Sequence, residues 1–213
     1  MSSNDIGQLL AYVASAIGVV MVVPQIHRIV RHPNMGGVSP WRWSILVVAC
    51  TLWFTYGVRS GSLPQIPGNV LLVSGAFTIV LLIPSTRSKL QRGSGLAALT
   101  AALVVASTWL SPERVGFMAF LVGLASMWPQ VYETVWRRRG QGRSSLSISS
   151  SALTVVSQTM WLIFAVITHD VPVTVAATVT LSTNLIITIV EASRHRASLR
   201  SAPDGMDLLP DAA

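Results

Sequence analysis

Residues 24–69 are PQIHRIVRHPNMGGVSPWRWSILVVACTLWFTYGVRSGSLPQIPGN, and this stretch decides the fold because a diverged copy of it, PQVYETVWRRRGQGRSSLSISSSALTVVSQTMWLIFAVITHDVPVTVAA, occupies residues 129–177. Each copy opens with Pro-Gln inside an apolar segment and continues through a basic loop rich in Gly or Ser. Each then carries a Trp, an aromatic residue three positions later, and a Pro. The same landmarks in the same order indicate that one unit occurs twice in the chain.

The composition is typical of a chain embedded in lipid. Of the 213 residues, 51% are hydrophobic and 11% are charged, and the apolar residues fall in long runs almost free of charge. The formal net charge of +7 comes from short basic clusters between these runs, which disfavours nucleic-acid binding. Cys50 is the only cysteine, so no disulfide forms within the chain, and its thiol is expected to pack as a small apolar group.

Seven apolar runs are long enough to cross a membrane as helices, for which about 17–25 residues are needed. They lie at residues 8–30, 41–58, 66–84, 94–110, 114–136, 147–168 and 171–190. We therefore expect an all-α polytopic membrane protein with seven transmembrane helices. The run at 94–110 is the shortest, and taken alone it also fits a buried or interfacial helix.

The basic residues predict the orientation of these helices, because Lys and Arg concentrate in cytoplasmic loops beside membrane ends. All 15 of them except Arg59 and Arg114 fall in the first, third and fifth loops and in the C-terminal segment. We expect an integral protein of the plasma (inner) membrane, with the N-terminus outside and the C-terminus in the cytoplasm. Without a helix at 94–110, the basic loops of the two copies would lie on opposite sides of the membrane. The helix at 94–110 is therefore expected to keep the two repeats parallel.

The repeat and the loop charges together predict four parts. A first triple-helix bundle is expected at 6–84, a linker transmembrane helix at 94–110 and a second triple-helix bundle at 113–191. This gives a 3+1+3 arrangement of helices. Residues 192–213 lose apolar continuity and gain Pro, Gly, Arg and Asp, which predicts a disordered cytoplasmic tail.

Pro-Gln lies near the cytoplasmic end of a spanning helix in each copy. A proline inside a helix removes a backbone hydrogen bond and permits a bend, so Pro24 and Pro129 are expected to act as hinges, with a static kink as the alternative. Gln25 and Gln130 are expected to bind the carbonyl groups that the prolines free, or else to line a cavity.

Trp53 and Trp161 occupy matching positions, and Tyr56 and Phe164 follow them by three residues. A Trp near a helix end is often an interfacial belt residue, but these positions also fit the wall of a cavity. Asn69, in the next spanning helix, carries an amide that is costly to leave facing lipid. An aromatic ring with an amide suits a neutral polyol, whose C–H surface packs on the ring while its hydroxyl groups bond to the amide.

These motifs resemble those of the SWEET and SemiSWEET sugar transporters in the PQ-loop (MtN3) superfamily. The resemblance covers residues 6–191, and its motifs in the first copy are Pro24-Gln25, Val38-Ser39, Leu52-Trp53, Tyr56-Gly57, Pro64 and Asn69. It implies that each triple-helix bundle supplies half of a central path, in which Trp53, Asn69 and Trp161 hold a sugar. It also implies facilitated diffusion by alternating access, without a cofactor.

The second copy departs from the family pattern at one position. The residue sixteen after Trp161, where the resemblance implies a second Asn, is Ala177. Asn184, two helical turns further on the same face, and Thr178, next in the chain, are the candidate replacements. The asymmetry leaves a smaller or different solute open.

A gate is expected at the outer end of the path. Tyr56 and Arg59 lie near the end of the second span, and Phe164 and Asp170 lie at the corresponding end of the second copy. A contact between Arg59 and Asp170 could hold this end shut, whereas two separately solvated charges would contribute only about 0–1 kcal/mol.

Two other functions stay open. A proton-coupled PQ-loop transporter of amino acids needs an ionisable group in the membrane, and the acids closest to the spans, Glu133 and Glu191, lie toward the cytoplasmic ends. A heptahelical cargo receptor or adaptor would share the same layout.

Other classes are excluded or not required. A retinal protein needs a Lys in its last helix, and the only Lys is Lys89, in a loop. The His residues lie in loops or at interfaces without a paired nucleophile, so neither enzymatic activity nor a metal is expected. Two repeats in one chain suffice for one path, so a homo-oligomer is compatible with the mechanism but not required by it.

Overall fold

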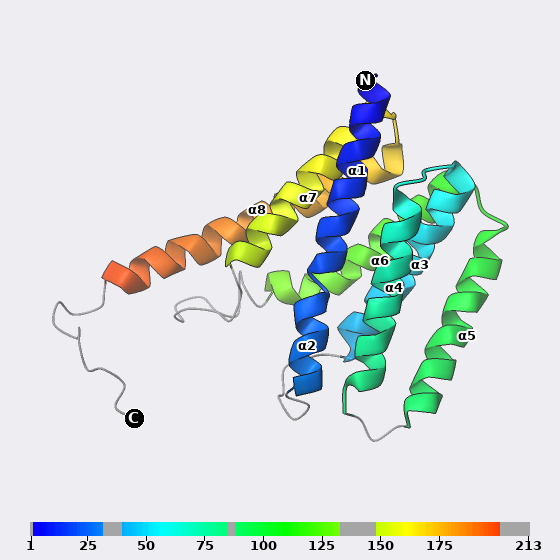
Figure 1. Ribbon diagram of the computed structural model, residues 1–213, viewed down its shortest axis with the longest axis horizontal. Coiled ribbons are helices and arrows are strands. Elements are labelled where there is room, and N and C mark those ends of the chain that lie inside the picture. Colours follow the sequence, from blue (N-terminus) through cyan, green and yellow to red (C-terminus); the bar gives the residue numbers. More distant parts are fainter. Residues whose placement is uncertain (1, 32–39, 85–87, 133–147, 201–213) are drawn as a thin grey trace.

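The computed structural model describes residues 2–31, 40–84, 88–132 and 148–200, and these residues form eight helices without a strand. The expectation of an all-α fold is confirmed. In chain order the helices are α1 (Ser3–Val20), α2 (Val23–Arg31), α3 (Pro40–Ser60), α4 (Gln65–Leu82), α5 (Lys89–Ser107), α6 (Pro112–Tyr132), α7 (Ile148–Ile167) and α8 (Val171–Arg200) (Figure 1).

The first apolar run, expected as one helix at 8–30, is two helices separated by Met21 and Val22. The interruption has its cause in Pro24, which has no N–H to donate to Val20 and whose ring crowds the turn before it. The Val22 N–H turns instead to the Val19 carbonyl, three residues back. The helix is thus interrupted just before Pro24, whereas a hinge motion there stays a prediction.

The last helix is longer than expected. The predicted tail began at residue 192, but α8 continues to Arg200. Hydropathy ends near Val190, while Ala, Leu and Arg of the following segment favour helix and the arginines suit its C-terminus. The rest of the expected tail, residues 201–213, lies outside the described residues.

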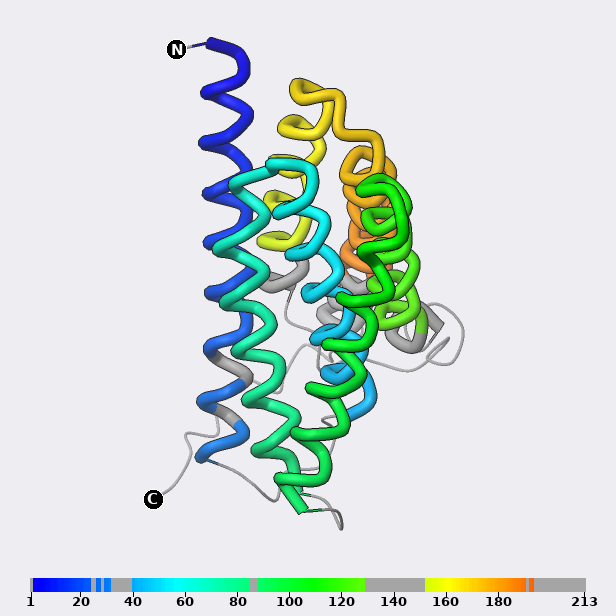
Figure 2. The backbone as a smooth tube through the Cα atoms, turned by 90° about the vertical axis from the view of Figure 1, so that its right-hand side faces the viewer, coloured from blue at the N-terminus to red at the C-terminus, as the bar shows by residue number. Residues whose placement is uncertain are grey.

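Six helices form a closed ring. Neighbours pack in the order α1, α4, α3, α6, α8, α7, and α7 packs back on α1 (Figures 1 and 2). In each copy of the repeat the third helix lies between the first and the second. The copies meet twice, at α3 with α6 and at α1 with α7, and α5 lies outside the ring against α3 and α4.

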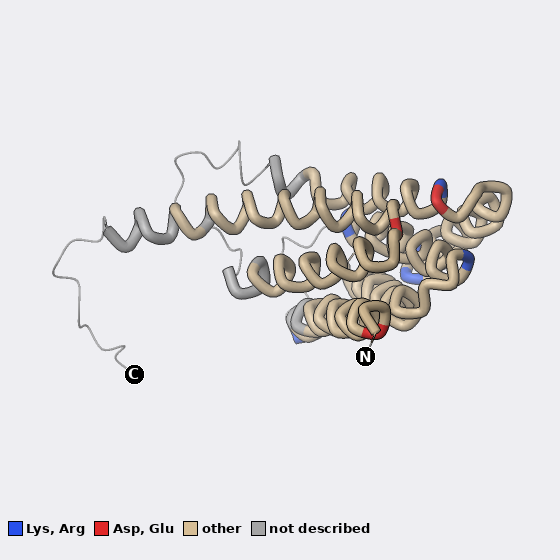
Figure 3. The backbone as a smooth tube through the Cα atoms, turned by 90° about the horizontal axis from the view of Figure 1, so that it is seen from above, with Lys and Arg blue, Asp and Glu red and all other residues tan. Residues whose placement is uncertain are grey.

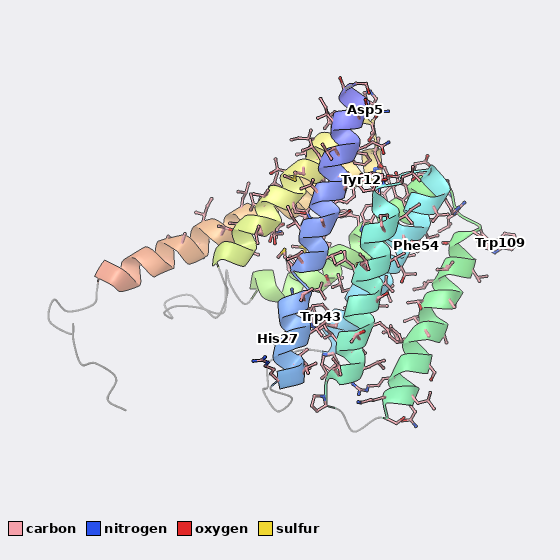
Figure 4. The ribbon with its side chains drawn as sticks, viewed as in Figure 1. Asp5, Tyr12, His27, Trp43, Phe54 and Trp109 are labelled. Atoms are coloured by element: carbon pink, nitrogen blue, oxygen red, sulfur yellow. The ribbon has the colours of Figure 1, made fainter. Side chains whose placement is uncertain are left out.

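The helices begin and end at two opposite ends of the bundle. The starts of α1, α4, α6 and α8 and the ends of α3 and α7 gather where the chain begins, and we call this the N-terminal end (Figure 1). Asp5 lies at this end in Figure 4, whereas His27, on α2, lies toward the opposite one.

The two copies share one hydrophobic core. Buried side chains from both copies meet in it, among them Leu52, Ala119, Ala165 and Val173, and Leu96 of α5 joins them. In lipid such contacts stabilise the fold through close packing rather than through removal of apolar surface from water.

The outward faces of the helices are apolar as well, as expected for a chain in contact with lipid. By length and mean hydropathy, Gln65–Leu82 (1.7) and Val171–Val190 (1.9) could each cross a membrane. Exposed aliphatic side chains lie on several helices, for example Leu9, Val13, Leu71, Val105, Leu121, Ile163, Val166, Ile186 and Ile189. Charged residues are few along the described backbone (Figure 3). These observations agree with the expected integral membrane protein.

Two arginines attach α5 to its neighbours. Arg59, near the end of α3, donates to the carbonyl oxygens of Ser107 (2.6 Å) and Leu110 (2.7 Å), where α5 ends. Arg92, near the start of α5, donates to carbonyl oxygens at the end of α4, those of Val80, Leu81 and Ile83. A guanidinium at a helix C-terminus pairs with carbonyl groups that lack a partner inside the helix.

Candidate functional site

The two aromatic pairs of the repeat adopt the same geometry. Trp53 and Tyr56 meet edge to face with ring centroids 5.7 Å apart and planes at 81°. Trp161 and Phe164 do so at 5.7 Å and 79°. Both Trp side chains are half-buried and pack against the shared core. The repeat in the sequence is therefore also a repeat in side-chain arrangement.

Tyr56 joins the two copies at the N-terminal end. Its hydroxyl group donates to Asp170 Oδ1 at 2.7 Å, from α3 of the first copy to the turn before α8 of the second. The same carboxylate oxygen accepts the Val173 backbone N–H at 3.1 Å, which holds it at the start of α8. Burial raises the pKa of the Asp170 carboxyl group above its ordinary value, and the hydrogen bonds from Tyr56 and Val173 partly oppose this rise.

The sequence left two alternatives for Arg59 and Asp170, a contact between them or two separate charges, and the structure shows no such contact. Arg59 donates to the end of α5 instead, as described above. Charge complementarity suggested an ion pair, but carbonyl groups at a helix C-terminus attract a guanidinium without the need for an acid. The contact across the copies is thus a hydrogen bond between a neutral phenol and a carboxylate.

Close packing surrounds this hydrogen bond. A Cβ added at Gly116, in the first turns of α6, would lie 2.7 Å from Pro172 Cβ and 3.1 Å from Tyr56 Cδ2. Phe164, the counterpart of Tyr56, is only 3% exposed. On α1, Gly7 packs against Ile167 of the second copy, whereas the Ser15 hydroxyl donates within the first copy, to the Pro64 carbonyl at 3.1 Å. The Tyr56–Asp170 hydrogen bond and the contacts at Gly116 and Gly7 join the two copies at the N-terminal end.

Replacing Gly116 by Ala is expected to destabilise the N-terminal end. The added methyl group must displace the rigid Pro172 ring, and overpacking of this kind costs about 1–3 kcal/mol. Thermal unfolding of the detergent-solubilised chain should show a lower midpoint. Gly95→Ala is the matched control, because its Cβ would meet nothing within 4 Å and Ala favours helix by about 1 kcal/mol. Equal midpoints for the two variants would contradict the close packing.

Asn69 lies in the first turns of α4 and is half-buried. Its Nδ2 donates to the Gln65 carbonyl oxygen at 2.7 Å, which fixes the orientation of the amide. The Oδ1 atom and the second N–H have no hydrogen bond within the described residues. They remain able to bind a hydroxyl group of a ligand.

The three candidates on α8 occupy different surroundings. Ala177 is 2% exposed, and Asn184 lies on the same face with 9% exposed. The Asn184 Nδ2 donates to the Thr180 carbonyl oxygen, as Asn69 does to that of Gln65. Thr178 is exposed and donates to the Thr174 carbonyl oxygen, about 100° around the helix from Ala177. Asn184 is therefore the better placed of the two replacements.

The expected hinge residues of the two copies differ in whether their helix is interrupted. Pro24 and Gln25 belong to α2, just after the interruption, whereas Pro129 and Gln130 lie inside α6, which continues to Tyr132. The side chains of all four lie outside the described part, so the role given to the two Gln residues stays a prediction. Glu133 also lies outside the described residues.

Sequence reasoning missed the polar contacts between helices of different copies. The Ser157 hydroxyl of α7 donates to the Ala14 carbonyl of α1 at 3.1 Å, and both residues are buried. The signal was available in principle, because a Ser inside an apolar span commonly marks a helix–helix contact. Which helix it faces depends on the ring order, which the sequence does not reveal.

Comparisons with known proteins agree with this geometry. Residues 6–66 match the family model of the PQ loop repeat. The fold matches that of a eukaryotic SWEET transporter with a TM-score of 0.69, over 89% of this chain and 99% of that one, at 14% sequence identity. Residues 6–66 are thus similar to a PQ loop repeat, and the fold of the chain is similar to that of a SWEET transporter. No curated relative matches its sequence significantly.

The family match ends at residue 66, just before Asn69, so it covers the first two spans of the first copy. The second copy is supported by the structure, in which its Trp161 and Phe164 repeat the geometry of Trp53 and Tyr56. At 14% identity the structural match concerns the fold, and the roles of individual residues are proposals.

Proposed function

We propose that this protein is a membrane transporter, not an enzyme, and that it mediates facilitated diffusion of a small neutral polar solute, a sugar, by alternating access. The hydrogen bond between Tyr56 and Asp170 carries the proposal. It connects the two copies at one end of the bundle, and Trp53 lies one turn deeper on α3 than Tyr56. A contact of this kind can open and close one entrance without disturbing the fold of either copy.

The solute class follows from the side chains beside this contact. Two half-buried Trp rings, one from each copy, offer faces on which the C–H surface of a sugar packs. Asn69 adds a neutral amide with one N–H and one oxygen to spare. Neutral groups of this sort suit hydroxyl groups better than the charged ends of an amino acid, which require opposite charges nearby.

The SWEET match also supports a transporter in the membrane. We propose that the N-terminal end faces outward and the C-terminus lies in the cytoplasm, in a plasma (inner) membrane, from the distribution of Lys and Arg. On this orientation the contact between Tyr56 and Asp170 would lie at the outer end of the proposed path. We further propose that the copies at 6–84 and 113–191 move as two bundles, and that residues 94–110 link them.

A solute screen tests the proposal. The full chain in detergent is heated with single sugars, polyols and amino acids, and a ligand of the folded state raises the unfolding midpoint. We expect a neutral sugar to raise it and to enter proteoliposomes that contain the protein. Stabilisation by amino acids alone, with uptake that requires a pH gradient, would favour the proton-coupled alternative instead.

A further inference from the structure

The two copies of the repeat place their polar side chains on different helices. Residues of the second copy match those 108 positions earlier, since Trp161 corresponds to Trp53 and Pro172 to Pro64. The third helix carries Asn69 in the first copy and Ala177 in the second. The second helix shows the reverse, with Leu46, Ala49 and Cys50 in α3 but Thr154, Ser157 and Gln158 in α7. The amide that is missing at Ala177 of α8 thus has a possible counterpart on α7, the amide of Gln158.

Gln158 shares a face of α7 with Trp161. It precedes Trp161 by three residues and Ala165 by seven, the spacing of one helix face. Ala165 is fully buried in the core, together with Val173 of α8. Thr159, Ile163 and Val166, which are exposed, lie about 80–140° around the helix from Gln158. Gln158 therefore lies between the buried and the exposed sides of α7, on the same side of the helix as Trp161.

The amide of Gln158 is half-buried and makes no hydrogen bond within the described residues. Two other polar side chains of α7 behave differently, since that of Thr159 donates to the Val155 carbonyl oxygen of its own helix and that of Ser157 donates to the Ala14 carbonyl oxygen. A Gln amide offers two N–H groups and an oxygen, and those of Gln158 are not buried away from the surroundings. They are free to bind a polar ligand or water.

We propose that Gln158 is the second amide of the solute site and replaces, from α7, the Asn that α8 lacks at Ala177. It would bind a hydroxyl group of the sugar that packs on Trp161, as Asn69 does beside Trp53. This inference rests on the proposed function and assigns a specificity-determining residue to it. A Gln side chain on α7 is longer than an Asn side chain on α8 and starts from a different helix. The proposed site is therefore asymmetric, and this asymmetry would determine which solute it prefers.

The first test measures solute affinity in the full chain. Gln158→Leu removes the amide at similar volume and is expected to raise the half-saturation concentration for D-glucose exchange roughly tenfold, with a smaller change in maximal rate. Adding Ala177→Asn to this variant should lower it again, because an amide returns to the site. Thr159→Ala, one residue away on the exposed face, is the control without effect. An unchanged half-saturation concentration in Gln158→Leu overturns the proposal.

The second test does not depend on transport. In a Cys50→Ala background, which removes the only native cysteine, Gln158→Cys is exposed to a water-soluble maleimide, with Thr159→Cys as the lipid-facing control. We expect rapid labelling of the first and little of the second. Equal labelling overturns the assignment of Gln158 to an aqueous path. If Gln158→Cys is labelled but the protein exchanges no sugar, Gln158 still lies on an aqueous path, and the proposed function is contradicted.

Discussion

Trp53→Ala and Asn69→Ala are each expected to abolish sugar transport while the protein stays folded in the membrane. The first substitution removes an aromatic platform and the second a hydrogen-bond partner, and each loss costs about 1–3 kcal/mol in binding. That corresponds to a roughly 5- to 150-fold loss of affinity. Uptake into proteoliposomes, normalised to the amount of folded protein, measures the effect.

Two matched control variants distinguish an effect on the solute site from the effect of removing any Trp or polar side chain. Trp109 lies beyond the end of α5, is 87% exposed and points away from the bundle in Figure 4, so Trp109→Ala should leave transport intact. Ser74, on the exposed side of α4, donates only to the Val70 carbonyl oxygen, so Ser74→Ala should do the same. Wild-type rates in both Trp53→Ala and Asn69→Ala would assign Trp53 to the interfacial belt instead.

Tyr56→Phe is expected to open the N-terminal end. The variant keeps the ring and its packing on Trp53 but loses the hydroxyl group that donates to Asp170. A hydrogen bond to a carboxylate is worth about 1.5–3 kcal/mol, enough to move a population between two states that differ by a few kcal/mol. Ala49 is buried and lies deeper on α3 than Tyr56, so Ala49→Cys in a Cys50→Ala background serves as a reporter. With Tyr56→Phe added, this cysteine should be labelled from outside faster than without it.

Asp170→Asn is the informative companion variant. Because Asp170 accepts from a neutral phenol rather than from Arg59, an amide oxygen can take the same hydrogen bond. The Asn side chain also avoids the cost of burying a charge, the cause that raises the pKa of Asp170. Labelling should therefore stay at or below the wild-type rate. Faster labelling in Asp170→Asn together with an unchanged rate in Tyr56→Phe would contradict this gate.

The sequence predicted the fold well where a single physical signal determined it. Apolar runs of spanning length identified the helices, and the repeated Trp and aromatic spacing identified the pairs Trp53–Tyr56 and Trp161–Phe164, which the structure places in the same geometry. The effect of Pro24 was anticipated as a bend, but whether a proline bends a helix or separates it into two depends on packing. Pro129, in the matching position, leaves α6 continuous.

Contacts that depend on the ring order were not predictable. Arg59 could be paired with an acid by charge alone, but its actual partners are carbonyl groups of α5, whose position outside the ring the sequence does not indicate. The same holds for Gln158, which becomes noticeable only when its face of α7 is known. The extension of α8 to Arg200 was missed because hydropathy was used to end a helix that propensity continues.

Counterflow at equal pH on both sides tests the central claim most directly. Proteoliposomes containing the full chain are loaded with the unlabelled sugar found in the screen, diluted into a trace of the labelled sugar, and treated with a protonophore. Alternating access without proton coupling predicts a transient accumulation of label that the protonophore does not change and that Trp53→Ala removes. Absence of accumulation with every neutral solute, or accumulation of an amino acid only under a pH gradient, would contradict it.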